Sequence, residues 1–135
     1  MKRKRVAAYV MILCTIVMIA GKSVSFANNY ENSAFSFNFG SNCYTEVRYK
    51  SDTSKLYMQC TGGIATYSAY AQACSAGGTV YKTYWNYGVT MSRGSTKYIS
   101  SDVYEDGYRN TRILGAVVSA GTASGVWSPD NYNGY

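Results

Sequence analysis

The residue types that perform chemistry are scarce in this chain. It has no histidine among its 135 residues, which removes the most frequent general base and the most frequent metal ligand of proteins. A Ser-His-Asp or Cys-His site is therefore excluded. Zinc would need a fourth ligand beside widely spaced cysteines, and no Cys-x-x-Cys pair is present. Two carboxylates would suffice for a glycosidase, but no acid lies in a distinctive setting, so we expect a non-enzymatic protein without catalytic residues or cofactors.

One acidic cluster lies between residues 102 and 107. Its side chains could gather oxygen ligands at a turn, as calcium requires. The candidate calcium ligands are Asp102, Glu105 and Asp106. Their spacing is not that of an EF-hand. We favour the alternative, a solvated loop whose acids face Arg109 and Arg112, and we expect no metal.

The cysteines offer a second kind of chemistry. Of the 4 cysteines, Cys14 lies in an apolar N-terminal run, and Cys43, Cys60 and Cys74 follow it. Export from the cell would permit a disulfide. Residue alternation places Cys43 and Cys60 on one face of a predicted hairpin, so we rank this pair slightly above Cys60–Cys74. Three reduced, buried thiols are the alternative.

Tyrosine is unusually abundant, with 15 residues in the chain. A tyrosine presents a flat apolar face and a hydroxyl at low rotamer cost, which suits a binding surface. Alternation along the predicted strands directs a subset outward. These candidate binding-face aromatics are Tyr44, Tyr57, Tyr70, Tyr84 and Tyr104. Ordinary cross-strand pairing is the alternative role for each of them.

The first 27 residues have the three parts of a secretory signal peptide. Residues 2–5 are basic, residues 6–20 form an uncharged apolar run, and Ser25-Phe26-Ala27 is a small-x-small exit. We expect cleavage between Ala27 and Asn28. The run is shorter than the roughly 20 residues that span a bilayer, and Cys14 lies too deep in it to accept a lipid. The sequence therefore predicts export machinery as a partner, membrane contact only during export, and a secreted product.

Removal of this leader changes the charge. The whole chain has 13 Lys and Arg against 7 Asp and Glu, a net charge of +6. Five of the basic residues precede residue 28, so 8 remain against 7 acids and the net charge falls to +1. No basic stripe is left to neutralise phosphates, and we expect no nucleic-acid partner.

The remaining residues, 28–135, alternate with a period of two and predict strands. The predicted strands cover residues 34–39, 43–50, 55–60, 64–73, 79–91, 96–100, 111–120 and 123–127, and residues 43–50 and 55–60 would form a hairpin. An Ala-rich helix is the alternative for residues 64–73. We expect an all-β fold, a single antiparallel β-sandwich or small barrel of about seven or eight short strands, preceded by a signal peptide helix. The predicted core is Phe35, Phe37, Val47, Leu56, Met58, Ile113, Leu114, Val117, Val118 and Trp127.

Three short motifs carry a family resemblance. Ala34-Phe35-Ser36-Phe37, Tyr67-Ser68-Ala69-Tyr70-Ala71 and the segment from Ser124 to Asp130 resemble the small exported Gram-positive proteins of domain-of-unknown-function family 2712. The resemblance implies an exported, strand-rich single domain with no known catalytic residues. The three cysteines after the leader depart from the largely cysteine-free pattern of that family. A looser similarity, by analogy only, is to lactococcin-type bacteriocins.

These observations lead to three functional expectations. The first is non-enzymatic binding to a cell-wall polymer or another envelope component through an aromatic sheet face. The alternative is a bacteriocin-like antimicrobial effector. The second alternative is a structural surface protein that packs or assembles.

Overall fold

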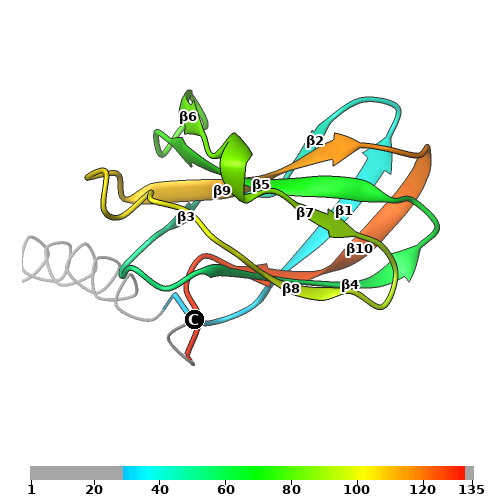
Figure 1. The fold of residues 1–135 in the computed structure, drawn as a ribbon, viewed down its shortest axis with the longest axis horizontal. Coiled ribbons are helices and arrows are strands. Elements are labelled where there is room, and N and C mark those ends of the chain that lie inside the picture. The colour runs from blue at the N-terminus through cyan, green and yellow to red at the C-terminus, as the bar shows by residue number, and fades with distance from the viewer. Residues whose placement is uncertain (1–28, 133–135) are drawn as a thin grey trace, which may run out of the picture.

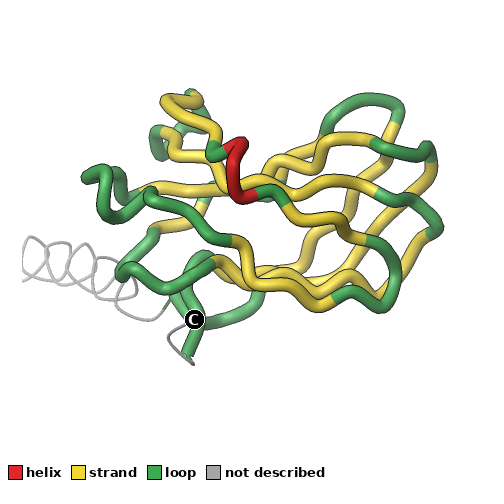
Figure 2. The backbone as a smooth tube through the Cα atoms, in the orientation of Figure 1, coloured by secondary structure: helices red, strands yellow, loops and turns green. Residues whose placement is uncertain are grey.

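The computed structural model describes residues 29–132 of the chain (Figure 1). The predicted signal peptide and its cleavage site at Ser25, Ala27 and Asn28 lie outside these residues. Within residues 29–132, no helix is long and apolar enough to cross a membrane. The strands are β1 (Ser33–Phe39), β2 (Cys43–Tyr44), β3 (Arg48–Tyr49), β4 (Leu56–Gly63), β5 (Tyr67–Cys74), β6 (Val80–Thr83), β7 (Val89–Met91), β8 (Thr96–Ile99), β9 (Asn110–Val117) and β10 (Gly121–Ser128). A 3-10 turn, η2 (Trp85–Tyr87), lies between β6 and β7 (Figure 2).

The strands form two antiparallel sheets that face each other (Figure 1). One is four-stranded, in the order β1-β10-β4-β8. The other is six-stranded, in the order β2-β9-β5-β6, with β3 also paired to β9 and β7 also paired to β5. The predicted all-β class is confirmed, and the sheets are open instead of closing into a barrel. The described residues contain more strands than predicted because the segments 43–50 and 79–91 are each interrupted.

Aromatic rings from both sheets fill the space between them. Phe35, Phe37 and Phe39 alternate along β1 and are all buried. From the opposite sheet, Tyr67 meets the rings of Phe37 and Phe39 at centroid distances of 5.7 Å and 5.1 Å. Gly115 on β9 makes room for them, since a Cβ there would lie 2.8 Å from the Phe37 ring. The three-Phe alternation of the sequence is thus the centre of the core.

Most of the predicted core is buried, but three valines are not. The buried residues are Phe35, Phe37, Leu56, Met58, Ile113, Leu114 and Trp127. Val117 and Val118 are exposed, because Val117 is the last residue of β9 and Val118 lies in the bend that follows it. Val47 is only half-buried, in the gap between β2 and β3. An apolar run at a strand end does not by itself indicate burial.

The predicted hairpin of residues 43–50 and 55–60 is wrong. Strands β2 and β3 pair with β9, whereas β4 pairs with β10 and β8. The link between β3 and β4 therefore crosses from the six-stranded sheet to the four-stranded sheet. Residues 64–73 are confirmed as mainly strand, in β5, so the helical alternative is wrong.

This pairing separates the candidate disulfide partners. Cys43 begins β2 in the six-stranded sheet, and Cys60 lies on β4 in the four-stranded sheet. In the described residues, Cys43, Cys60 and Cys74 are all free thiols, so the structure contains neither the Cys43–Cys60 nor the Cys60–Cys74 bond. Burial raises the pKa of the Cys74 thiol, and the nearby charge of Arg112 opposes that rise.

Candidate functional site

The outer face of the six-stranded sheet carries a row of aromatic side chains. On β5, Ala69 and Ala71 face the core, so Tyr70 and Gln72 face outward. On β9, Ile113 faces the core, so Arg112 and Leu114 face outward. Antiparallel pairing then places Leu114 directly between Tyr44 of β2 and Tyr70 of β5.

The row continues onto the 3-10 turn. The ring of Trp85 meets that of Tyr70 at a centroid distance of 5.0 Å and an interplanar angle of 64°. Leu114 is only 2% exposed, although it lies on the outer face, and it forms the floor of the row. Tyr44 and Trp85 are 48% and 62% exposed. We call Tyr44, Leu114, Tyr70 and Trp85 the aromatic strip.

A chain of planar polar groups lies beside the aromatic strip. The Arg112 guanidinium lies 4.1 Å from the centroid of the Tyr44 ring, and its Nε donates to Gln72 Oε1 at 2.9 Å. The Gln72 amide in turn donates from Nε2 to Thr83 Oγ1 at 2.9 Å. These contacts hold the guanidinium and amide planes in fixed positions beside the aromatic strip.

Gly88 allows the turn to lie against the sheet. A Cβ at this position would lie 2.2 Å from Cε1 of Tyr70, a distance at which the ring would have to move. Gly88 has φ −63° and ψ 145°, which any residue adopts. Glycine is therefore required here by the close approach of Tyr70 and not by backbone conformation.

An open pocket of about 180 Å³ adjoins the Trp85 end of the strip. Its lining residues are Lys82, Thr83, Tyr84, Trp85, Asn86, Tyr87 and Asp102. At its edge, Asp106 Oδ2 accepts hydrogen bonds from Lys82 Nζ and Tyr84 Oη, each at 2.8 Å. The Tyr87 hydroxyl donates to Asp102 Oδ2 at 3.2 Å.

These contacts show how two acids of the cluster between residues 102 and 107 are used in the structure. Hydrogen bonds from Lys82 and then from Tyr84 lower the pKa of Asp106. Asp102, Glu105 and Asp106 do not converge, and residues 29–132 include no group of three His, Cys, Asp or Glu side chains that could hold a metal. The calcium interpretation therefore finds no support.

The preferred alternative, a solvated loop, is right about the exposure of Glu105 and Asp106 and wrong about the arginines that their side chains face. Arg109 does not face the acids: its guanidinium lies 3.8 Å from the centroid of the Tyr104 ring and donates to backbone carbonyls. Arg112 belongs to the polar chain beside the aromatic strip.

The five candidate tyrosines do not share one face. Tyr44 and Tyr70 belong to the aromatic strip. Tyr57 lies on the four-stranded sheet, where its ring meets that of Tyr98 at 5.7 Å, as cross-strand pairing predicts. Tyr104 lies in the loop before β9. Tyr84 was expected to project outward and is buried as part of the hydrophobic core, with its hydroxyl donating to Asp106.

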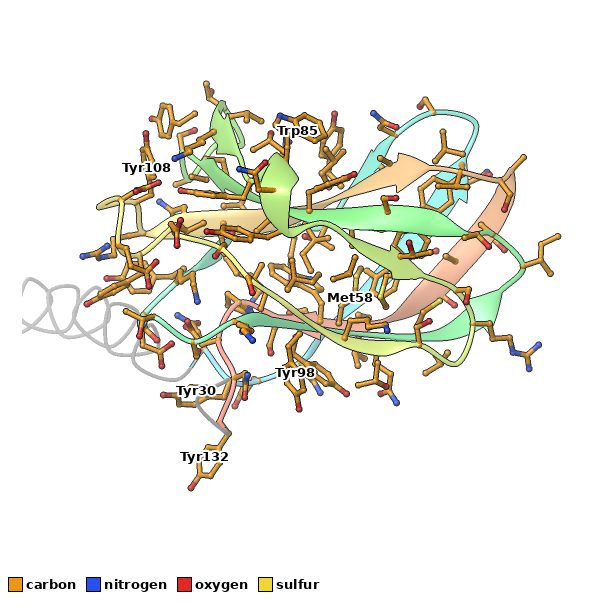
Figure 3. The ribbon with its side chains drawn as sticks, in the orientation of Figure 1. Tyr30, Met58, Trp85, Tyr98, Tyr108 and Tyr132 are labelled. Atoms are coloured by element: carbon orange, nitrogen blue, oxygen red, sulfur yellow. The ribbon has the colours of Figure 1, made fainter. Side chains whose placement is uncertain are left out.

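Trp85 was not among the candidates, although it is the most exposed ring of the strip. The sequence placed it inside one long strand, where alternation gives it no special position. Its signal was the short run from Tyr84 to Gly88, in which aromatic residues end at a glycine. Figure 3 shows Trp85 above the six-stranded sheet and Tyr98 on the opposite side of the molecule.

The fold and this face define the class: an all-β protein of two open antiparallel sheets that exposes an aromatic strip. The family model described as "Protein of unknown function (DUF2712)" matches residues 23–131, and the chain belongs to that family. No curated protein and no solved structure matches the chain. The resemblance carried by the three sequence motifs is confirmed at the level of the family.

Proposed function

We propose that this protein is a non-enzymatic β-sandwich, secreted by a Gram-positive cell, that binds a polysaccharide of the cell envelope on its aromatic strip. The observation that carries the proposal is the row of Tyr44, Tyr70 and Trp85 over the buried Leu114, with exposed rings at both ends and fixed polar neighbours. The basic and apolar leader, with its small-x-small exit, supports secretion after cleavage at Ala27.

The strip has the chemistry that sugars require. The face of an aromatic ring is electron-rich, so it attracts the weakly positive C–H groups on one side of a pyranose ring. Sugar hydroxyls then need donors and acceptors at the ring edges. Arg112 provides such donors, and its hydrogen bond to the buried Gln72 fixes its orientation before any ligand arrives.

The shape of the strip suits a polymer better than a small sugar. Neighbouring strands lie about 4.8 Å apart, so the row from β2 through β9 and β5 to Trp85 extends over about 15 Å. An open surface of this length accommodates several consecutive sugar rings. The pocket beyond Trp85 would receive one further substituent, and its lining of Lys82, Asn86 and Asp102 favours a polar one.

Co-sedimentation of the purified protein with isolated Gram-positive cell walls tests the proposal. Removal of an anchoring tryptophan typically costs about 2 kcal/mol of binding free energy, and 1.4 kcal/mol is about tenfold in affinity. We therefore expect Trp85→Ala to weaken wall binding about tenfold or more.

A matched pair of tyrosines provides the control. Tyr44→Ala, in the strip, should weaken binding, whereas Tyr98→Ala, on the opposite sheet with 38% exposure, should not. Equal losses from both variants, or no sedimentation of the wild-type protein, would refute the proposal. If the protein does not bind cell walls but kills related cells, the bacteriocin-like alternative would be favoured instead.

A further inference from the structure

A lysine and an aspartate face each other in the interior, away from the aromatic strip. Lys50 follows β3 and Asp130 follows β10, and both side chains are 0% exposed. Lys50 Nζ lies 2.8 Å from Asp130 Oδ1. Charged side chains are almost never fully buried, and burial of such a pair carries a large desolvation cost. The burial of this charged pair therefore needs a functional explanation.

The amine is held by backbone carbonyls. Besides Asp130, Lys50 Nζ donates to the carbonyl oxygen of Ser54 at 2.5 Å and to that of Pro129 at 2.8 Å. Those contacts fix the nitrogen beside the Asp130 carboxyl group. The same carbonyl oxygens can accept a hydrogen bond from the Lys50 nitrogen for as long as it carries an N–H.

The two carboxylate oxygens of Asp130 are in different environments. Oδ1 accepts a hydrogen bond from the Lys50 amine, whereas Oδ2 accepts hydrogen bonds from the Ser51 backbone N–H at 2.9 Å and from Ser51 Oγ at 2.8 Å. Two donors on one oxygen, with a nucleophile beside the other, form the arrangement that stabilises the oxyanion in acyl transfer.

A second carboxylate lies close to the pair. Burial raises the pKa of Asp52, and hydrogen bonds from Ser54 and Tyr30 outweigh that effect, so its pKa is lowered. The Tyr30 hydroxyl donates to Asp52 Oδ2 at 2.9 Å.

We propose that Lys50 and Asp130 condense to form an intramolecular amide bond that joins the two sheets covalently. The proton of the ammonium first crosses to the carboxylate, which gives a neutral amine and a carboxylic acid. The amine lone pair attacks Cγ of Asp130, and the negative charge develops on Oδ2, where Ser51 donates both of its hydrogen bonds. A second proton leaves the nitrogen for Oδ1, the Cγ–Oδ1 bond breaks, and one water molecule departs.

The balance of this step is complete. One C–N bond forms, one C–O bond breaks, and one positive and one negative charge disappear together, so no oxidant, reductant or activating group is needed. Well-oriented groups gain effective concentrations of about 10⁵ M or more. In the product, Oδ2 keeps both Ser51 donors, and the amide N–H keeps a backbone carbonyl as its acceptor.

The bond would close a loop between positions that are 80 residues apart in the sequence. It would tie the end of β10, in the four-stranded sheet, to the end of β3, in the six-stranded sheet. A cross-link of this kind does not depend on cysteine, and it would persist in a reducing medium in which a disulfide opens.

Intact-mass spectrometry of the full chain after export and purification tests the proposal. We expect the mass of the folded protein to be about 18 Da below that of its processed sequence, the mass of one water. Proteolysis and fragment sequencing should then yield one branched peptide that contains both Lys50 and Asp130. A folded protein with the full sequence mass would overturn the proposal, whatever the variants do.

Two variants separate this bond from other losses of water. Asp106-Gly107 can lose water as a succinimide, but that product has no branched peptide and persists in Lys50→Arg. Under the proposal, Lys50→Arg has its full sequence mass. Asp130→Asn offers an amide leaving group, so its deficit changes to about 17 Da, the mass of ammonia. A deficit of one water in Lys50→Arg, with no branched peptide in the wild type, would contradict the proposal.

Discussion

Substitution of Gly88 tests how the 3-10 turn supports the aromatic strip. A Cβ in Gly88→Ala would lie 2.2 Å from Tyr70 Cε1 and 2.8 Å from both Cδ1 and Cζ. Three ring atoms would have to move, and the Tyr70 ring is already in contact with Trp85. The backbone dihedrals at Gly88 suit alanine, so the whole cost is steric. Overpacking of this kind costs about 1–3 kcal/mol.

Urea unfolding followed by tryptophan fluorescence measures this cost. With an m-value of about 1.5 kcal/mol/M, a loss of about 2 kcal/mol lowers the unfolding midpoint by roughly 1 M. The control is Gly40→Ala, because a Cβ at Gly40 meets nothing within 4 Å. We expect the control to change the free energy of unfolding by about 0.5 kcal/mol or less.

The same two variants report on binding. Displacement of Tyr70 and Trp85 should weaken wall binding by Gly88→Ala, whereas Gly40→Ala should bind as the wild type does. Equal midpoints for the two variants would refute the packing argument. A destabilised Gly88→Ala that binds walls with wild-type affinity would refute the assignment of binding to the strip.

Three further predictions follow from the charged groups. Asp130→Ala leaves Lys50 buried with neither its ion-pair partner nor the proposed amide bond and should lower the free energy of unfolding by at least about 3–5 kcal/mol, measured by urea titration, whereas an unchanged midpoint would contradict the buried pairing. The pKa of Asp106 is lowered in the folded state from its ordinary value of 3.8, so its contribution to stability is present above that pH and is lost as the pH falls below it. Asp106→Asn should therefore make the melting temperature less dependent on pH between neutral pH and pH 3. A variant whose melting temperature falls with acid as steeply as that of the wild type would contradict this prediction. Because the three loop acids do not converge, addition of millimolar calcium or of a chelator should leave the melting temperature unchanged, and a rise of several degrees with calcium would restore the calcium hypothesis.

The sequence predicted strands and faces better than it predicted partners. Alternation of Phe35, Phe37 and Phe39 correctly indicated one buried face of β1, since a period of two is a local property. The pairing of residues 43–50 with 55–60 failed because sequence proximity does not decide which strands pair. Those two segments find their partners far along the chain, in β9 for the first and in β10 and β8 for the second.

The candidate site was predicted only in part for a similar reason. Tyr44 and Tyr70 were directed outward correctly, but their alignment across Leu114 depends on the register of three strands. The position of Trp85 depends on the 3-10 turn, which can lie against Tyr70 only because residue 88 is glycine. The contact between Lys50 and Asp130 has no local signal, because 80 residues separate them.

The central claim is that the aromatic strip binds a polysaccharide of the cell wall. Chemical-shift mapping by nuclear magnetic resonance, with soluble wall fragments added to the isotopically labelled protein, tests it directly. We predict shifts in the amide signals of Tyr44, Tyr70 and Arg112 and in the indole N–H signal of Trp85, with none at Tyr98. No shifts at saturating fragment, or shifts confined to the four-stranded sheet, would contradict the account.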